Sequence, residues 1–175
     1  RDGGVLVYNH GLDVSNSADH AYKVLTKDIG NGALASNTIN CLVKDKRGEM
    51  WVGTSAGLSI FSSPENVFNG TESGSFDSRQ IVIKTGLVYS NFLGGENINC
   101  ITIDGANRKW IGTNNGAWLV SSDGYTVIHN FTTKNSSILD NNVLSIGIDN
   151  NTGEVFFGTL KGMVSFKGNA TESGV

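Results

Sequence analysis

One short pattern occurs three times in the chain: an aromatic residue, an apolar residue, glycine and threonine. The copies are Trp51–Thr54, Trp110–Thr113 and Phe156–Thr159. An aspartate precedes each copy and a further glycine follows it at a fixed offset, so the same local structure is expected three times. This array of repeats constrains the fold more than any other feature of the sequence. The residues of the repeat signature are Asp45, Gly48, Trp51, Gly53, Thr54, Gly57, Asp104, Trp110, Gly112, Thr113, Gly116, Asp149, Gly153, Phe156, Gly158, Thr159 and Gly162.

Short apolar stretches separated by Gly, Asp and Asn turns fill each repeat. Residues 4–8 and 19–29 predict the last two strands of a first repeat, so the numbered chain is expected to open inside a repeat. The other expected strands are 39–43, 50–54, 58–61 and 80–84, then 97–103, 109–113, 117–121 and 125–129, and finally 143–148, 154–158 and 163–166.

Four short strands in a unit of about 40–50 residues are typical of a β-propeller blade. A single such sheet cannot bury both of its faces, so blades stack, with the aromatic residue of the second strand as the main packing group. The sequence therefore predicts an all-β fold, a partial β-propeller of about three and a half four-stranded antiparallel blades. The blades of this single propeller fragment are expected at roughly 1–34 (a C-terminal half-blade), 35–92, 93–138 and 139–175, with the last strand left open.

Composition agrees with short strands and many tight turns. Glycine supplies 23 of the 175 residues and charged residues make up only 17%, whereas a helical bundle would carry more Ala, Glu, Lys and Leu. The net charge is −3 without a Lys/Arg cluster, which argues against a nucleic-acid partner. No apolar run approaches the roughly 20 residues of a spanning helix. The chain opens at Arg1 without a signal peptide, so a fragment or a mature product is expected.

No residue pattern points to catalysis, a metal or a cofactor. The segment 149–154 places oxygen ligands at alternate positions, as in a calcium loop. The equivalent turns of the other repeats lack those ligands, which favours a structural hairpin. The three histidines have no zinc-ligand spacing. The protein is thus predicted not to be an enzyme and to have no cofactor.

The two cysteines, Cys41 and Cys100, fall at the same position of two repeats. Stacked sheets lie about 10 Å apart, which exceeds the roughly 7 Å that a disulfide allows between Cα atoms. Two free, buried thiols are therefore expected.

Two aromatic residues have an alternative interpretation. Trp118 and Tyr125 could line a sugar-binding surface, because aromatic rings stack on the apolar faces of sugars. Core packing is favoured for Trp118, which lies inside a predicted strand. The sequence assigns no ligand-binding residue.

The repeat resembles the two-component-regulator propeller repeat of periplasmic sensor domains in Bacteroidetes hybrid histidine kinases. The segment 37–58 carries this resemblance. Along it come, in order, an Asn, an Asp, a Gly, the run Trp-Val-Gly-Thr and the pair Gly-Leu. Longer runs resemble the last propeller blades of PorZ-type proteins associated with type IX secretion. Mild departures from that family are Ser136-Ser137-Ile138 and Met163. The runs that carry the second resemblance are 104–113, 117–119, 131–136 and 152–159.

The resemblance implies a non-enzymatic scaffold or binding module of the bacterial cell envelope. The PorZ-type family assists type IX secretion and the attachment of anionic lipopolysaccharide to secreted cargo. The alternative is a periplasmic glycan-sensing module of a hybrid two-component histidine kinase. The expected partners are envelope proteins or a glycan or lipopolysaccharide ligand, and the expected location is the periplasm or the outer-membrane surface. Because an open arc of blades exposes two sheet faces, the fragment is expected either to close with distortion or to pair with a second copy.

Overall fold

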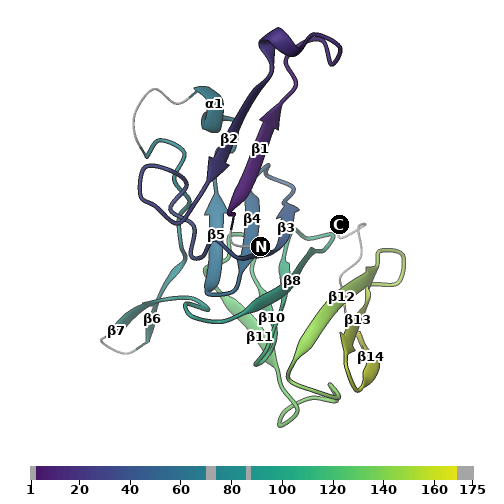
Figure 1. The fold of residues 1–175 in the computed structure, drawn as a ribbon. Helices are drawn as coiled ribbons and strands as arrows, with labels where there is room; N and C mark the ends of the chain where they lie inside the picture. The colour runs from purple at the N-terminus through teal and green to yellow at the C-terminus, as the bar shows by residue number, and fades with distance from the viewer. Residues whose placement is uncertain (1–2, 70–73, 86–87, 169–175) are drawn as a thin grey trace.

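The computed structural model describes residues 3–69, 74–85 and 88–168, which are built almost entirely of antiparallel strands (Figure 1). Two short helical turns, η1 (Ser17–Asp19) and α1 (Asn66–Asn69), interrupt them. The strands are β1 (Val5–Asn9), β2 (Ala21–Leu25), β3 (Ile39–Lys44), β4 (Met50–Thr54), β5 (Gly57–Phe61), β6 (Val82–Thr85), β7 (Val88–Asn91), β8 (Ile98–Ile103), β9 (Lys109–Thr113), β10 (Gly116–Val120), β11 (Val127–Phe131), β12 (Val143–Asp149), β13 (Glu154–Thr159) and β14 (Gly162–Lys167).

These strands form a series of up-and-down sheets that follow one another along an arc. The order is β1–β2, then β3–β4–β5, then β8–β9–β10–β11, then β12–β13–β14. Figure 1 shows this arc running from β1–β2 at the top to β12–β14 at the lower right. The first strands of consecutive sheets, β3, β8 and β12, lie next to one another at its inner side. The prediction of an all-β, partial propeller is confirmed.

The connection after β5 departs from the predicted pattern. Residues 80–84 are expected to form the fourth strand of the second blade, beside β5, and this prediction is wrong. β6 instead pairs with β7 in a separate hairpin, and β5 meets the connection only through a bridge between Ile60 and Arg79. The physical reason is local: a second β-forming stretch follows closely in sequence, so hairpin closure costs less chain entropy than pairing with β5. In the described residues, only the β8–β11 sheet has four strands.

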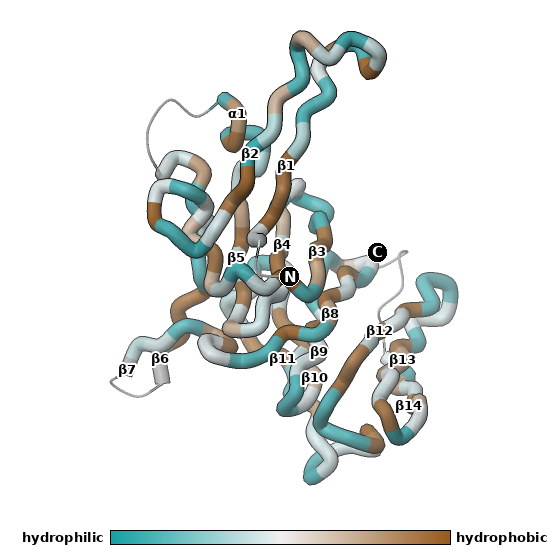
Figure 2. Tube along the Cα trace, in the orientation of Figure 1, coloured by the Kyte–Doolittle hydropathy of each residue, from teal (hydrophilic) through white to brown (hydrophobic). Residues whose placement is uncertain are grey.

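Three hydrophobic clusters occupy the three spaces between consecutive sheets. In Figure 2, hydrophobic residues gather on the central strands, and hydrophilic residues on the turns between them. Trp51 packs with Ile111 in the cluster between the second and third sheets, and Val52, on the opposite face of β4, packs with Leu25 toward the first. Trp110 packs in the same way toward the fourth sheet. Each buried aromatic residue removes about 150–250 Å² from water, which is worth about 4–6 kcal/mol at 25 cal/mol per Å².

The last copy of the signature packs differently from the other two. Phe156 aligns with Trp51 and Trp110, which are both fully buried, yet it is only half-buried. It lies on the face of β13 that no further sheet of the described chain covers. Its neighbour Phe157 is buried instead and lies 6.1 Å from Trp110, measured between ring centroids.

The signature glycines of the second strand allow a side chain of the first strand to fit beside them. A Cβ on Gly112 would lie 2.6 Å from the sulfur of Cys100, which is the cross-strand partner of this glycine. The same clash would occur between Gly53 and Cys41. In the last sheet the first-strand position is taken by Ser145, so the rule is a small residue opposite glycine. Both thiols are free, but they are half-buried, not fully buried as expected.

The two ends of the arc leave apolar residues exposed. On β1 and β2 the cross-strand pairs Leu6–Val24 and Tyr8–Tyr22 face outward. At the other end, Met163 of β14 is 68% exposed. The open question of a further strand after β14 falls on 169–175, which lie outside the described residues.

Gly112→Ala is expected to destabilise the protein by about 1–3 kcal/mol, because the added methyl group overpacks the Cys100 and Val143 contacts. Gly147→Ala is the matched control, since a Cβ there meets nothing within 4 Å. Urea unfolding followed by tryptophan fluorescence measures both. Equal stability of the two variants would contradict the packing described here.

Candidate functional site

The threonine of each signature copy closes the turn between the second and third strands of its sheet. The Oγ1 atoms of Thr54, Thr113 and Thr159 donate to the carbonyl oxygens of Gly57, Gly116 and Gly162, at 2.8, 2.9 and 3.0 Å. Each Oγ1 also accepts a backbone N–H two residues further on, at 3.1, 3.0 and 3.2 Å. The three glycines have φ values of +129°, +123° and +124°, which strongly favour glycine. The signature threonines and glycines therefore stabilise the turn.

The aspartates of the signature hold the turn between the first and second strands. The Oδ1 atom of Asp45 accepts the backbone N–H groups of Arg47 and Glu49, at 2.8 and 3.0 Å. Asp104 makes the same two bonds, and its Oδ2 atom accepts the indole N–H of Trp110 at 3.0 Å. In the last sheet, Asp149 accepts the backbone N–H of residue 151 at 2.9 Å. The segment 149–154 therefore has the same side chain-to-backbone bond as the other turns.

One buried ion pair joins the second and third sheets. Lys109 and Asp45 have fully buried side chains, and the lysine Nζ lies 2.9 Å from Asp45 Oδ2. The ammonium also donates to the backbone carbonyls of Asn107, at 3.0 Å, and of Ser122. Its three protons thus have three acceptors. The same Nζ lies 4.7 Å from the ring centroid of Trp51.

The environment of this pair shifts both of its titrating groups. Burial by itself raises the pKa of the Asp45 carboxyl, but hydrogen bonds from Lys109, Asn107 and the backbone of Arg47 outweigh it, so the pKa is lowered. Burial lowers the pKa of the Lys109 ammonium, and the hydrogen bond that the ammonium donates to Asp45 opposes this effect without cancelling it. The pair is a structural contact between sheets, because neither side chain reaches solvent.

A row of asparagine side chains follows the inner end of the sheets. Asn40 on β3 donates to the carbonyl of Ile98 at 2.9 Å, and Asn99 on β8 donates to the carbonyl of Val143 at 3.0 Å. Each bond links one sheet to the next. Further asparagines extend the row by side chain-to-side chain bonds, namely Asn97, Asn114 and Asn142. The row borders an open hollow of about 550 Å³ near the inner side of the arc.

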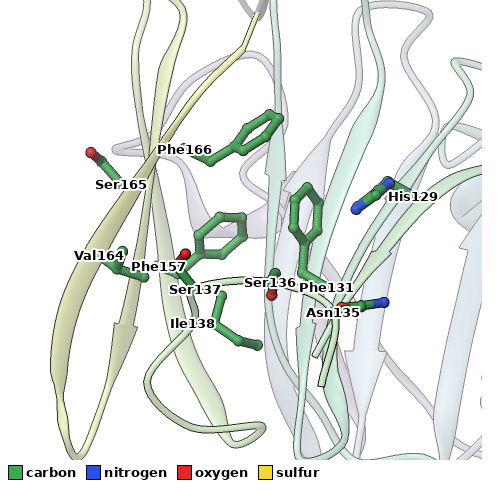
Figure 3. Close-up of a pocket in the computed structure, with 10 residues that line it drawn as sticks. All are labelled: His129, Phe131, Asn135, Ser136, Ser137, Ile138, Phe157, Val164, Ser165 and Phe166. Carbon is green, nitrogen blue, oxygen red and sulfur yellow. The ribbon is translucent and has the colours of Figure 1, made fainter. Parts of the chain in front are cut away.

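A second hollow, of about 260 Å³, lies at the outer rim between the third and fourth sheets. Figure 3 shows Phe157 and Phe166 extending from one sheet toward Phe131 on the other. The ring centroids of Phe131 lie 5.2 Å from Phe157 and 5.1 Å from Phe166. His129 packs on Phe131 at 4.3 Å. Phe131 and Phe157 are buried members of the core cluster between these sheets, and Phe166, which is 41% exposed, extends it to the surface.

Two of the polar side chains at this rim are hydrogen-bonded within the chain. The Asn135 amide donates to the carbonyl of Asn130 at 2.9 Å and accepts the backbone N–H of Thr132 at 2.7 Å. The Ser136 hydroxyl donates to the carbonyl of Thr132 at 2.7 Å. The rim hollow is thus lined by aromatic rings and by the polar side chains of His129, Ser137 and Ser165, beside the two that are engaged.

The candidate residues for other chemistry lie in the second sheet (Cys41) and in or beside the third (Cys100, Trp118 and Tyr125). Burial raises the pKa of Cys41 to about 11 and that of Cys100 to about 12, so neither is a thiolate at neutral pH. Among the described residues, no three His, Cys, Asp or Glu side chains are grouped so as to hold a metal ion. Tyr125 is 57% exposed, and Trp118 is partly buried against the core and lines a pocket.

Comparison with known protein families identifies the type of repeat. The sequence profile of a family described as "Two component regulator propeller" matches residues 33–56, which include the Trp51 copy of the signature. The chain carries this repeat. The matched segment covers strands β3 and β4 and the turn between them. No curated protein matches the sequence.

Two of the solved structures that are similar to the chain are informative. PorZ is a bacterial surface component of the type IX secretion system of Porphyromonas gingivalis. It is 23% identical over 97% of this chain, with a TM-score of 0.83. The extracellular domain of the hybrid two-component system BT3049 from B. thetaiotaomicron is 26% identical over 79% of it, with a TM-score of 0.60. The chain covers 23% of the PorZ chain and 17% of the BT3049 chain. These similarities show a shared propeller fold.

The sequence reasoning missed the groups that join the sheets. Lys109 was not singled out, although Met50 and Val155 hold the equivalent apolar positions and a lysine there is unusual. The asparagines at 40 and 99 were also missed, although they recur next to the two cysteines. These asparagines occur at the same position of two repeats, and this recurrence could have indicated their role.

Lys109→Met is expected to cost about 3–5 kcal/mol, because it leaves the Asp45 carboxylate buried without its cation. The double variant Asp45→Asn, Lys109→Met should recover most of that loss. Because the pKa of Asp45 is lowered on folding, its stabilising contribution is present above the ordinary value of 3.8 and is lost as the pH falls through the lowered value.

Urea unfolding at neutral pH and near pH 3 measures these effects. The double variant should lose less stability on acidification than the wild type. Additive losses in the double variant would contradict the pairing.

Proposed function

We propose that the chain is part of a non-enzymatic binding module of the bacterial cell envelope, with a PorZ-like role in type IX secretion and in attaching lipopolysaccharide to cargo. This proposal rests on one observation, which is that the polar residues of the repeat signature are already engaged in hydrogen bonds. The aspartates and threonines that recur in every repeat are bonded to turn backbone, which leaves the loops and hollows between sheets for binding. Repeat folds commonly use such extended surfaces for partners.

The similar structures support the same cellular setting. PorZ is described as a bacterial surface component and the BT3049 domain as extracellular. A periplasmic or outer-membrane location is proposed from this likeness. None of the described helices is long and apolar enough to cross a membrane.

The second candidate is a glycan-sensing module of a hybrid two-component system. It is favoured by the match of the repeat profile to residues 33–56 and by the likeness to the BT3049 domain. In either role the exposed end faces of the arc, with Leu6, Tyr8 and Met163, are proposed contact surfaces for envelope partners or for a second copy.

The proposal predicts reversible binding of the protein to envelope glycoconjugates without turnover. Surface plasmon resonance with immobilised protein would use anionic lipopolysaccharide from a bacterium with type IX secretion, and neutral oligosaccharides, as analytes. Binding of lipopolysaccharide supports the secretion role, and binding of oligosaccharides alone supports the sensing role. Mass spectrometry of the recovered analytes is the control, because a cleaved or modified product would contradict a non-enzymatic function. If neither analyte binds, the proposed binding function is contradicted.

A further inference from the structure

The outer edge of β14, the last strand of the fourth sheet, has no partner strand among the described residues. Such an edge carries a row of N–H and C=O groups that can pair with another extended segment. We propose that this edge, together with the rim hollow beside it, binds an extended apolar segment of a partner protein as a fourth strand. The inference deepens the proposed binding role, because it adds a surface and the chemistry of the partner.

The equivalent strands of the second and third sheets are covered at the same edge. In the third sheet, β11 pairs with β10 over 117–120. In the second sheet, Arg79 bridges Ile60 of β5, and Phe61 packs with Phe76 from the same connection. In both sheets, therefore, a segment of the chain lies over the edge that the described residues leave open in the fourth sheet.

The exposure of one side chain of β14 reflects this missing cover. Phe61, Val120 and Phe166 hold the same position of the three strands. Phe61 and Val120 are 5% and 0% exposed, whereas Phe166 is 41% exposed. Phe166 nonetheless faces the third sheet, where its ring centroid lies 5.1 Å from that of Phe131 (Figure 3). Its exposure therefore comes from the uncovered strand edge and not from the free face of the fourth sheet.

The rim hollow lies beside this exposed ring. Val164 and Phe166 of β14 line one wall, and His129 and Phe131 of β11 line the other (Figure 3). The volume of about 260 Å³ is below the roughly 300–1,000 Å³ of most small-molecule sites. It suits one or two side chains that project from a strand paired with β14.

The cover of the third sheet indicates the chemistry of the occupant. β11 places Val127 opposite Val120, and its five residues include no Lys, Arg, Asp or Glu. A segment that adds to β14 in the same register would place an apolar residue opposite Phe166, at the hollow. Among the described residues that line the hollow, none is Lys, Arg, Asp or Glu.

A charged side chain in the hollow would therefore lose water against phenylalanine rings without a counter-ion. The partner segment is accordingly extended and uncharged, with apolar residues at alternate positions. In strand addition of this kind, main-chain hydrogen bonds supply affinity and the pockets for alternate side chains supply specificity.

A synthetic peptide that copies residues 125–133 is the probe, because this segment carries the strand that completes the third sheet. Fluorescence anisotropy of the labelled peptide, titrated with the protein, is expected to show saturable binding. The same peptide with Ile128→Pro should bind about tenfold more weakly, since proline cannot donate to a strand ladder. Hydrogen exchange followed by mass spectrometry should show that the bound peptide protects the amides of 162–167.

Variants of the protein locate the peptide. Phe166→Ala should weaken binding about tenfold, because apolar contact at the hollow is lost. Ser137→Trp should also weaken it, because Ser137 is exposed and lines the hollow, which the larger ring would fill. Leu160→Ala is the matched control, since Leu160 is an exposed apolar residue of the same hairpin that does not line the hollow. Circular dichroism establishes the folding of each variant, and Ser137→Trp decides if Phe166→Ala does not fold.

Failure of the peptide to bind would overturn the proposal. Binding that leaves the amides of β14 unprotected would overturn it as well, and so would binding that the hollow variants leave unchanged. The peptide carries no glycan, so neither outcome bears on the binding of glycoconjugates by surface plasmon resonance. The two proposals therefore fail separately.

Discussion

The structure depends on the burial of each sheet against the next one along the arc. A three- or four-stranded sheet has two apolar faces and can hide neither alone, so every sheet relies on its neighbour. Trp51 and Trp110 supply the largest buried side chains of the described residues, one in each of two consecutive spaces. The signature glycines let consecutive sheets approach, because a Cβ on Gly53 would lie 2.7 Å from Ile98 of the next sheet. Where no described sheet follows, Phe156 is left half-buried although its sequence position is the same.

Polar contacts between the sheets fix their positions more than they add stability. The Lys109–Asp45 pair is buried and fully hydrogen-bonded, and such pairs generally repay little more than their desolvation cost. The bonds of Asn40 and Asn99 to the first strand of the next sheet repeat one geometry at two consecutive junctions. Leu144 takes the equivalent position in the last sheet, where no described sheet follows. A packed apolar interface with a few directional bonds sets the register between blades.

The sequence predicted the repeat, the fold class and most strands, because Gly-Thr turns and apolar alternation are local signals. It did not predict the hairpin β6–β7, since local pairing competed with pairing to β5 and only three-dimensional context decides between them. Nor did it predict the partner of Lys109, which lies 64 residues away in the chain. Trp118 was weighed correctly as a residue packed on the core, but the pocket beside it is created by the hairpin and could not be foreseen.

A double-mutant cycle between Trp110 and Phe157 tests most directly whether the sheets stabilise one another through these aromatic contacts. The two rings come from different sheets, with centroids 6.1 Å apart. Free energies of unfolding would be measured for Trp110→Ala, Phe157→Ala and the double variant. The account predicts a coupling energy of about 0.5–3 kcal/mol between them. Losses that add to within about 0.3 kcal/mol would contradict it.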